Sequence, residues 1–314
     1  MVCREPRVVG TAEEEIVSKR IVVTGAGGRL GAALVREWKS AGLDVLGFSR
    51  QELDLAQPEQ MHAVLDGVEF GVLVNCAAQT NVDRCETHPE EAMQINAHAV
   101  RTLAEICKAK GARCVQISTD YVFDGAKDTA YTEEDPVVPI SHYGESKRAG
   151  ELALLEVSAG NLAVRVSWVF GPDRPSFVDG IVKRALTEEK VEAIADKIAV
   201  PTYTLDAAQL LKPFLFDVPA GGVLHVCNGG ACTWQEYGQF ALDCAAAAGM
   251  PLKARTVGPL KMAELKAFIA KRPRNTAMST AKLTRLTGQH PRDWREAVRE
   301  YITRHVAAKG WETV

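Results

Sequence analysis

The stretch Arg20-Ile-Val-Val-Thr-Gly-Ala-Gly-Gly-Arg-Leu-Gly31 joins a short β-branched run to a glycine-rich turn. Its glycines follow the spacing G-x-x-G-x-x-G through Gly25, Gly28 and Gly31, whereas Leu30 takes the last slot of the G-x-G-x-x-G pattern. Glycines at these places permit a tight turn and let a pyrophosphate approach the backbone, and the following helix supplies amides at its positive end. A glycine-rich turn by itself is a weak signal, but its place between a strand and a helix predicts a dinucleotide-binding loop.

Strand-like and helix-like stretches alternate downstream of this loop. The predicted strands are 20–24, 43–48, 71–75, 113–118 and 162–166, and the predicted helices are 30–40, 58–65, 90–110 and 143–157. Strands that alternate with helices indicate βαβ units and a parallel sheet. The sequence therefore predicts an α/β fold, a Rossmann-type doubly wound parallel sheet with a smaller C-terminal α/β substrate lobe.

The pattern becomes less regular after residue 171. We expect strands at 191–195, 222–226 and 252–256, and helices at 233–248, 260–270 and 294–306. Thr233 and Glu236 have the spacing of a capping box at the start of the first of these helices. We expect residues 1–19 to be an extension or interaction tail, 20–170 to be an NAD(P)-binding domain completed by parts of 203–250, and 171–314 to be mainly the substrate lobe.

The composition narrows the class of protein. The chain has 314 residues, 46% of them hydrophobic and 25% charged, with a formal net charge of −3, so it offers no basic face for nucleic acid. Its eight cysteines show no C-x-x-C spacing, which disfavours a metal site and favours a reducing, cytoplasmic location. No apolar run approaches the roughly 20 residues of a membrane span, so no membrane partner is expected.

The end of the second strand bears on the choice of cofactor. An NAD site usually has an acid there to bind the ribose 2′-hydroxyl, but this chain has Ser49 followed by Arg50. A guanidinium suits a 2′-phosphate, so we expect NADP(H), with NAD(H) as the alternative. The alternative for Arg50 is a solvated loop residue. We expect Asp54 and Leu55 to flank the adenine. The third strand ends in residues small enough for a dinucleotide to lie across them, Cys76, Ala77 and Ala78.

A second set of residues indicates acid–base chemistry. Tyr143 and Lys147 are spaced i, i+4, so on a helix they share one face. A nearby ammonium favours the phenolate, so we expect Lys147 to lower the pKa of Tyr143 and to make the phenol a usable general acid. Ser118-Thr119-Asp120 ends a strand at the edge where open α/β sheets bind their ligands.

With these motifs the chain resembles the extended short-chain dehydrogenase/reductases and, within them, the dTDP-4-dehydrorhamnose reductase family. The resemblance runs from about residue 20 to residue 290. It is carried by TGAGGRLG (24–31), VNCAA (74–78), Val82, Asp83, Glu86, STDYVFDG (118–125), YGESKRAGE (143–151), RVSWVFG (165–171), Pro201, Thr202 and KRPRN (271–275).

The resemblance implies a role for each matching residue. Tyr143 would protonate the C4 oxygen of the substrate, Lys147 would bind the nicotinamide ribose, and Thr119 would hydrogen-bond the reacting carbonyl. The implied cofactor-binding residues are Gly25, Gly28, Arg29, Leu30, Gly31, Ser49, Arg50, Asp54, Leu55, Cys76, Ala77, Ala78, Tyr143 and Lys147. The implied substrate-binding residues are Thr119, Asp120, Tyr121, Trp168 and Arg272, with Asn275 as a further candidate. The family also implies a nucleotide-sugar substrate, a homodimer and dTDP-rhamnose biosynthesis.

Two other functions remain open from the sequence. The extension at 1–19 resembles that of the methionine adenosyltransferase β subunit, an NADP-binding regulatory relative, although Thr119, Asp120 and Trp168 favour catalysis. A sugar-nucleotide epimerase or dehydratase is the other alternative. Dehydratases tend to have an acidic pair after the threonine, and here Tyr121 follows Asp120.

Overall fold

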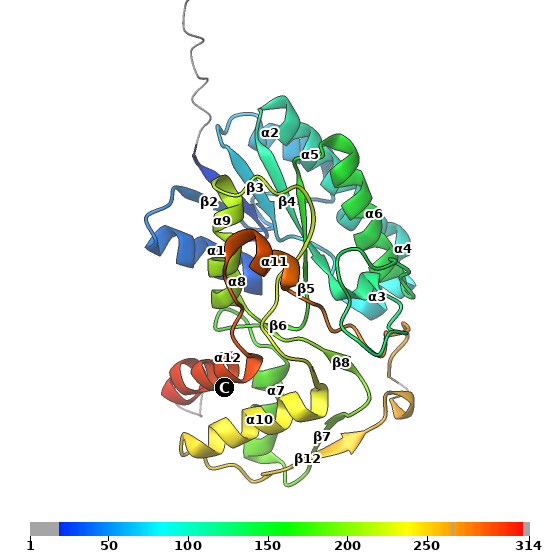
Figure 1. Ribbon diagram of the computed structural model, residues 1–314, viewed down its shortest axis with the longest axis vertical. Helices are drawn as coiled ribbons and strands as arrows, with labels where there is room; N and C mark the ends of the chain where they lie inside the picture. Colours follow the sequence, from blue (N-terminus) through cyan, green and yellow to red (C-terminus); the bar gives the residue numbers. More distant parts are fainter. Residues whose placement is uncertain (1–18, 266, 310–314) are drawn as a thin grey trace, which may run out of the picture.

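A six-stranded parallel sheet forms the centre of the computed structural model, which describes residues 19–265 and 267–309 (Figure 1). Its strands are β1 (Ile21–Thr24), β2 (Val45–Phe48), β3 (Val72–Asn75), β4 (Arg113–Thr119), β5 (Leu162–Val166) and β10 (Gly222–His225). Their order is β10-β5-β4-β3-β1-β2. Thr24 pairs with Phe48 of β2 and with Asn75 of β3, so the strand order reverses at the carboxyl end of β1. The predicted doubly wound α/β fold is confirmed.

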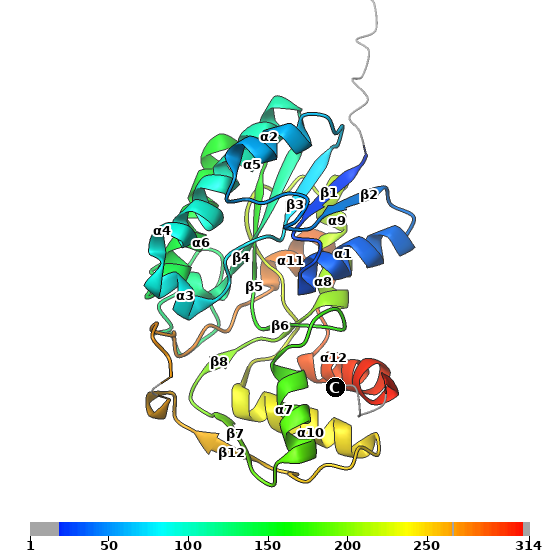
Figure 2. The ribbon, with the colours of Figure 1, turned by 180° about the vertical axis from the view of Figure 1, so that it is seen from behind.

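Both faces of the sheet are apolar. Successive side chains along each strand point alternately into two hydrophobic cores. Ile21 and Val23 face one core, and Val22 faces the other. The first core packs against α1 (Arg29–Ser40), α8 (Thr204–Leu211) and α9 (Pro213–Phe216), and the second packs against α2 (Pro58–Leu65), α5 (Ala99–Ala109) and α6 (His142–Val157). Figures 1 and 2 show these two layers on opposite sides of the strands. Burial on both faces is the usual condition of a parallel sheet.

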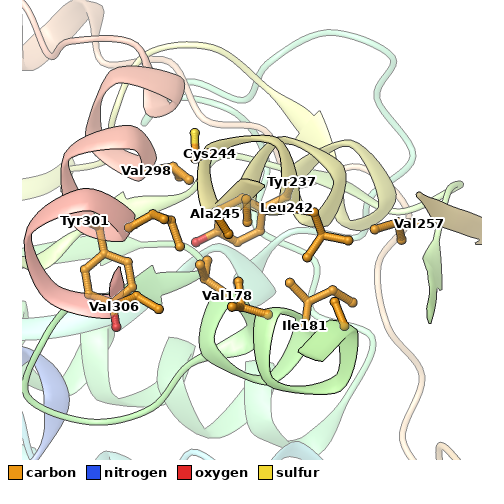
Figure 3. Close-up of a cluster of buried hydrophobic side chains, with 14 of the residues drawn as sticks. Val178, Ile181, Tyr237, Leu242, Cys244, Ala245, Val257, Val298, Tyr301 and Val306 are labelled. Carbon is orange, nitrogen blue, oxygen red and sulfur yellow. The ribbon is translucent and has the colours of Figure 1, made fainter. Parts of the chain in front are cut away.

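A smaller lobe lies beyond the carboxyl ends of the strands (Figure 2). Its core is formed by α7 (Phe177–Thr187), α10 (Trp234–Ala247), α12 (Trp294–Tyr301) and the parallel pair β7 (Val191–Ile194) and β12 (Val257–Leu260). Figure 3 shows side chains of the three helices meeting in this core. Two short strand pairs lead into the lobe. β6 (Val169–Phe170) pairs with β9 (Thr202–Tyr203), and β8 (Ile198–Ala199) pairs with β11 (Cys232–Thr233).

The structure corrects several predicted elements. The helix expected at 90–110 consists of α4 (Pro89–Met93), a π-helical turn (Gln94–His98) and α5. In the π turn, the carbonyl oxygen of Asn96 lies so close to α6 that a Cβ on Gly150 would be 2.1 Å from it. The strand expected at 252–256 is wrong, since the strand begins at Val257. The helix expected at 260–270 is also wrong, because only Met262–Glu264 forms a 3₁₀ turn among its described residues. The last predicted helix ends in a π-helical turn, Ile302–Val306.

Four shorter helical segments complete the described chain: α3 (Val82–Thr87), α11 (Ala281–Thr287) and the 3₁₀ turns at Asp120–Val122 and Ala307–Lys309. The expected extension falls almost entirely on residues 1–18, which lie outside the described residues. Across 19–265 and 267–309, no helix is long and apolar enough to cross a membrane.

Candidate active site

A cavity of about 750 Å³ opens at the carboxyl ends of the central strands, where open α/β sheets bind their ligands. The site residues expected from the sequence that line it are Gly25, Gly28, Arg29, Leu30, Ser49, Arg50, Asp54, Leu55, Cys76, Ala77, Ala78, Thr119, Asp120, Tyr121, Tyr143, Lys147 and Trp168. Gly31 and Arg272 do not line it. The fold thus brings most of the expected residues to one place.

Gly25 and Gly31 let the glycine loop pack closely against the turn after β3 and the start of α1. Gly25 has a φ of 67°, and a Cβ there would lie 2.6 Å from the amide nitrogen of Ala77. A Cβ on Gly31 would lie 2.3 Å from the carbonyl oxygen of Gly25, so Gly31 lets α1 pack against the loop instead of contacting the cavity. The N-cap of α1, Gly28, makes no side-chain cap, and the first turn contains no acid. The amides at this helix end therefore fit a pyrophosphate.

The side chain of Arg29 turns away from the loop toward the segment after β6. Its guanidinium donates to the carbonyl oxygens of Val169 at 3.2 Å and Arg174 at 3.1 Å, and also to that of Pro175. Leu30 is buried in the core beneath α1. Both residues border the cavity, but the guanidinium of Arg29 is engaged by the chain's own backbone.

The end of β2 has mixed charge. Arg50 has a side chain that is 76% exposed and lies 3.5 Å from the carboxylate of Asp54. An acid that the sequence analysis did not single out, Glu52, accepts a hydrogen bond from the backbone amide of Ser49 at 2.8 Å. The backbone and side-chain hydrogen bonds from Ser49 lower the pKa of Glu52. The carboxylate at this strand end is therefore already bonded within its own turn.

The small residues after β3 are held by a chain of buried hydrogen bonds. Thr24 donates to the side-chain oxygen of Asn75 at 2.5 Å, and Asn75 donates to Gln116 at 2.6 Å. The same oxygen of Asn75 accepts from the amide of Ala77 at 3.0 Å, which orients the turn that follows the strand. Burial raises the pKa of Cys76 to about 12, so its thiol is uncharged at neutral pH.

The residue predicted to be the acid–base group, Tyr143, lies where α6 begins. Tyr143 is buried beside Thr119, whose hydroxyl opposes part of the rise that burial causes in the pKa of Tyr143. The ring of Tyr121 meets that of Tyr143 edge to face, with centroids 5.6 Å apart. Gly144 makes this arrangement possible, because a Cβ there would lie 2.3 Å from the carbonyl oxygen of Tyr121. Close contact between α6 and the end of β4 thus brings the hydroxyl groups of Tyr143 and Thr119 close together.

The predicted effect of Lys147 on the pKa of Tyr143 is wrong for this structure. Burial raises the pKa of Tyr143 above its ordinary value, and Lys147 is not among the groups that act on it. The ammonium of Lys147 instead donates to the carbonyl oxygen of Ile117 at 2.6 Å. Burial lowers the pKa of Lys147 to about 8. The spacing i, i+4 put both residues on one helix face, but it did not predict how deeply the phenol is buried.

Asp120 has partners that the sequence analysis did not anticipate. Its carboxylate accepts hydrogen bonds from the hydroxyl groups of Thr119 at 3.0 Å, Ser167 at 2.8 Å and Thr276 at 2.5 Å. Burial raises its pKa, and the positive charge of the buried Lys197 opposes that shift. No local motif marked Lys197 or Thr276, which come from the second lobe. Ser167 lies in the quoted block 165–171, but no role had been expected for it.

Lys197 is itself held tightly beside the site. Its ammonium donates to the carbonyl oxygen of Pro273 at 2.7 Å and lies 4.8 Å from the ring centroid of Tyr121. Burial lowers its pKa to about 8. The second lobe thus supplies a positive charge behind the Asp120–Tyr121 pair.

Ser118 has a structural partner. It donates to Glu151 at 2.6 Å, and Arg165 forms two hydrogen bonds of 2.8 Å with the same carboxylate. Burial opposes ionisation of Glu151, but its hydrogen bonds and charge interaction with Arg165 leave its pKa lowered. This buried ion pair ties α6 to β4 and β5 beneath the acid–base residues.

Trp168 forms the boundary with the second lobe in a strained conformation. Its φ is 40°, an uncommon value for a residue with a side chain. Its ring lies beside Trp234 and Tyr237, with centroids 5.6 and 6.0 Å away. Its buried Nε1 has no hydrogen-bond partner among the described residues. A strained residue with an unpaired donor at a cavity is typical of a ligand contact.

The two candidates in block 271–275 are occupied by other contacts. Arg272 donates to both carboxylate oxygens of Asp83, at 3.1 and 2.9 Å, and lies over the ring of Phe268. The hydrogen bonds from Arg272 lower the pKa of Asp83 to about 2. Asn275 donates to the carbonyl oxygen of Lys127 at 2.8 Å. The structure places both residues in contacts that hold this segment against the rim.

The fold, the glycine loop and the Tyr143–Lys147 pair define a dinucleotide-dependent reductase of the extended short-chain class. The sequence profile of the family described as "RmlD substrate binding domain" matches residues 19–307. The chain belongs to this family, as the resemblance predicted. In the described part of the chain, no group of three or more His, Cys, Asp or Glu side chains is placed to hold a metal ion.

Known relatives cover nearly the whole chain. The spore coat polysaccharide biosynthesis protein SpsK of Bacillus subtilis is 34% identical over 92% of this chain and 99% of its own. The dTDP-4-dehydrorhamnose reductase of Mycolicibacterium smegmatis is 32% identical over 97% of this chain and 93% of its own. The crystal structure of dTDP-4-dehydrorhamnose reductase from Bacillus anthracis in complex with NADP is 30% identical, with a TM-score of 0.84, over 91% of this chain and 99% of that one.

Proposed function

We propose that the protein uses NADPH to reduce the C4 ketone of dTDP-4-dehydrorhamnose to dTDP-rhamnose. The observation that carries the proposal is the placement of Tyr143 and Thr119 together at a dinucleotide-sized cavity, in a chain whose relatives include named dTDP-4-dehydrorhamnose reductases. The NADP complex of the Bacillus anthracis relative supports the choice of cofactor.

The residues present fit such a cofactor. Gly25, Gly27 and Gly28 border the cavity, and the amides at the start of α1 have no capping side chain. Residues of the glycine loop and the turn after β3 would hold the dinucleotide, and Lys147 lies close enough to the same cavity to bind the ribose. When bound, NADPH supplies the hydride for the reduction.

The chain's own residues would handle the proton and the developing charge. The Tyr143 hydroxyl donates its proton to the C4 oxygen. The Thr119 hydroxyl, which donates to Asp120 in this structure, turns to donate a second hydrogen bond to the C4 oxygen when substrate binds. Because burial raises the pKa of Tyr143, the phenol is protonated at neutral pH and starts in the form that a reduction needs. Asp120, with its three hydroxyl partners, binds sugar hydroxyls, and Trp168 forms the wall against the ring.

The test is the oxidation of NADPH, followed by absorbance, with dTDP-4-keto-6-deoxy-L-lyxo-hexose as substrate and NADH in parallel. We expect rapid NADPH oxidation and a loss of most turnover in Tyr143→Phe, which keeps the ring but removes the proton donor. Cofactor binding by this variant should be retained. Unchanged turnover in Tyr143→Phe would refute its role, and an inactive wild-type protein that binds NADPH would favour a regulatory function.

The family relationship also supports two broader proposals. We expect a homodimer, which sedimentation of the purified protein would test. We also expect a cytoplasmic location, since the proposed substrate and NADPH are metabolites of that compartment, and fractionation of cells that express the full chain would test this.

A further inference from the structure

The segment after β6 carries an arginine that the glycine loop holds at the edge of the cavity. Arg174 is exposed, borders the cavity, and donates through Nε to the carbonyl oxygen of Gly27 at 2.9 Å. In the opposite direction, Arg29 of the glycine loop donates to the carbonyl oxygen of Arg174. Two arginines thus connect the loop and the segment reciprocally.

The guanidinium of Arg174 is directed toward the end of β2. A Cβ placed on Gly27 would lie 3.9 Å from Nη2 of Arg174 and 3.7 Å from Cβ of Ser49. Among the described residues, neither Nη of Arg174 has a hydrogen-bond partner, so these donors are free for a ligand. The end of the second strand is where this class of fold places the adenosine ribose and its 2′ position.

The charges at this place require a second cation if a 2′-phosphate is to bind. Arg50 is 3.5 Å from Asp54, and Glu52 is bonded to the Ser49 amide beside it. Arg50 is therefore the one cation among these three side chains, and the combined formal charge of Arg50, Glu52 and Asp54 is negative. Arg174 brings the group to neutrality before a phosphate binds, and its planar fork can donate two hydrogen bonds to one phosphate.

The segment that carries Arg174 is well anchored. Pro172 and Pro175 flank it and restrict its backbone, and Asp173 forms an ion pair with Arg36 of α1. Together with the contacts of Arg29, these features hold the guanidinium in place before a ligand arrives. A preorganised donor loses less conformational entropy on binding.

We propose that Arg174, held by Arg29 and the carbonyl of Gly27, binds the 2′-phosphate of NADP(H) together with Arg50 and makes the protein prefer NADP(H) to NAD(H). This inference rests on the proposed function and deepens it by naming a specificity residue from the segment that leads into the second lobe. Arg29 is a positioning residue in this arrangement, because its side chain holds the segment and not the ligand.

The experiment measures binding of 2′,5′-ADP and of 5′-AMP by calorimetry, with no sugar substrate and no turnover. Arg174→Ala should raise the Kd for 2′,5′-ADP about tenfold or more, the effect of one lost charge-assisted hydrogen bond, and should change the Kd for 5′-AMP by less than about twofold. Arg174→Lys keeps the charge but loses the fork, so it should fall between Arg174→Ala and the wild type. Arg184→Ala removes a comparably exposed arginine on α7, paired with Glu188, and should change neither Kd.

Other outcomes would overturn the proposal. Equal weakening of both ligands by Arg174→Ala would mean that Arg174 only supports the glycine loop. Equal affinity of the wild-type protein for 2′,5′-ADP and 5′-AMP would also refute the proposal. That result would still be compatible with a reductase that uses NADH. Conversely, selective loss of 2′,5′-ADP in a protein that does not reduce the sugar substrate would support the role of Arg174 and refute the proposed reaction.

Discussion

Replacing Gly144 with alanine tests whether close packing of α6 positions the acid–base group. The new Cβ would lie 2.3 Å from the carbonyl oxygen of Tyr121. Carbon and carbonyl oxygen atoms normally approach to about 3.3 Å, so α6 and the turn after β4 must separate by about 1 Å. Tyr143 is the neighbouring residue and Tyr121 belongs to that turn, so the shift falls directly on the two hydroxyl groups of the site.

The structure gives the size of both effects. Overpacking of this kind costs about 1–3 kcal/mol, and the gain from removing a helical glycine offsets roughly 0.5–1 kcal/mol of that. We therefore expect a net loss of up to about 2.5 kcal/mol in the free energy of unfolding. A 1 Å misplacement of reacting groups costs about 100-fold in rate, so kcat should fall by about that factor.

The assay combines thermal unfolding with NADPH-dependent turnover, and Gly180→Ala serves as the control. Gly180 lies in α7, and a Cβ there would meet no atom within 4 Å. This control should be stabilised by about 0.5–1 kcal/mol and should keep full activity. If Gly144→Ala retains the wild-type kcat and Tm, the close approach does not position Tyr143, and the argument fails.

Three further predictions concern stability and reactivity. Arg165→Met leaves the carboxylate of Glu151 buried without its main partner, so denaturant unfolding should show a loss of about 3–5 kcal/mol, and a loss under 1 kcal/mol would contradict a buried ion pair. Asp83→Asn removes the ion pair with Arg272; because the pKa of Asp83 is lowered from 3.8 to about 2, the pair stabilises the fold above about pH 4 and loses this effect as the pH falls through 2. The variant should therefore be less stable by about 2 kcal/mol at pH 7, and its deficit should shrink between pH 4 and 2; a deficit independent of pH would refute the assignment. Cys76, with a pKa raised to about 12, should react with iodoacetamide at pH 8 about 10³-fold more slowly than an exposed thiol, as peptide mass spectrometry would measure; rapid labelling would show that burial does not suppress the thiolate.

Local pattern was sufficient for the central sheet and for much of the candidate site. The β-branched run at Ile21–Thr24 and the glycines after it predicted a strand, a turn and a helix, and the structure has all three. The carboxyl ends of parallel strands lie at one edge of the sheet, so the polar residues that end β1 to β5 were expected to lie close together there. The i, i+4 spacing likewise put Tyr143 and Lys147 on one face of α6.

Local pattern failed where the second lobe begins. The apolar stretch at 260–270 has helical spacing, yet after one 3₁₀ turn the segment runs along the rim, and the amides of Ile269 and Ala270 donate to Asp83. Hydrogen bonds to a residue far away in the sequence outweighed a favourable local helix propensity. The same contact occupies Arg272, which the sequence had suggested for the substrate.

The sequence by itself determined the fold class and predicted the dinucleotide loop and the acid–base pair, because each depends on residues close together in the chain. Only the tertiary structure decided that burial raises the pKa of Tyr143, that Lys197 lies behind Tyr121, and that Arg174 reaches Gly27 across 147 positions. Burial and charge depend on which distant segments pack together. No spacing within a single segment reports those contacts, so the electrostatics of the site became visible only in the folded chain.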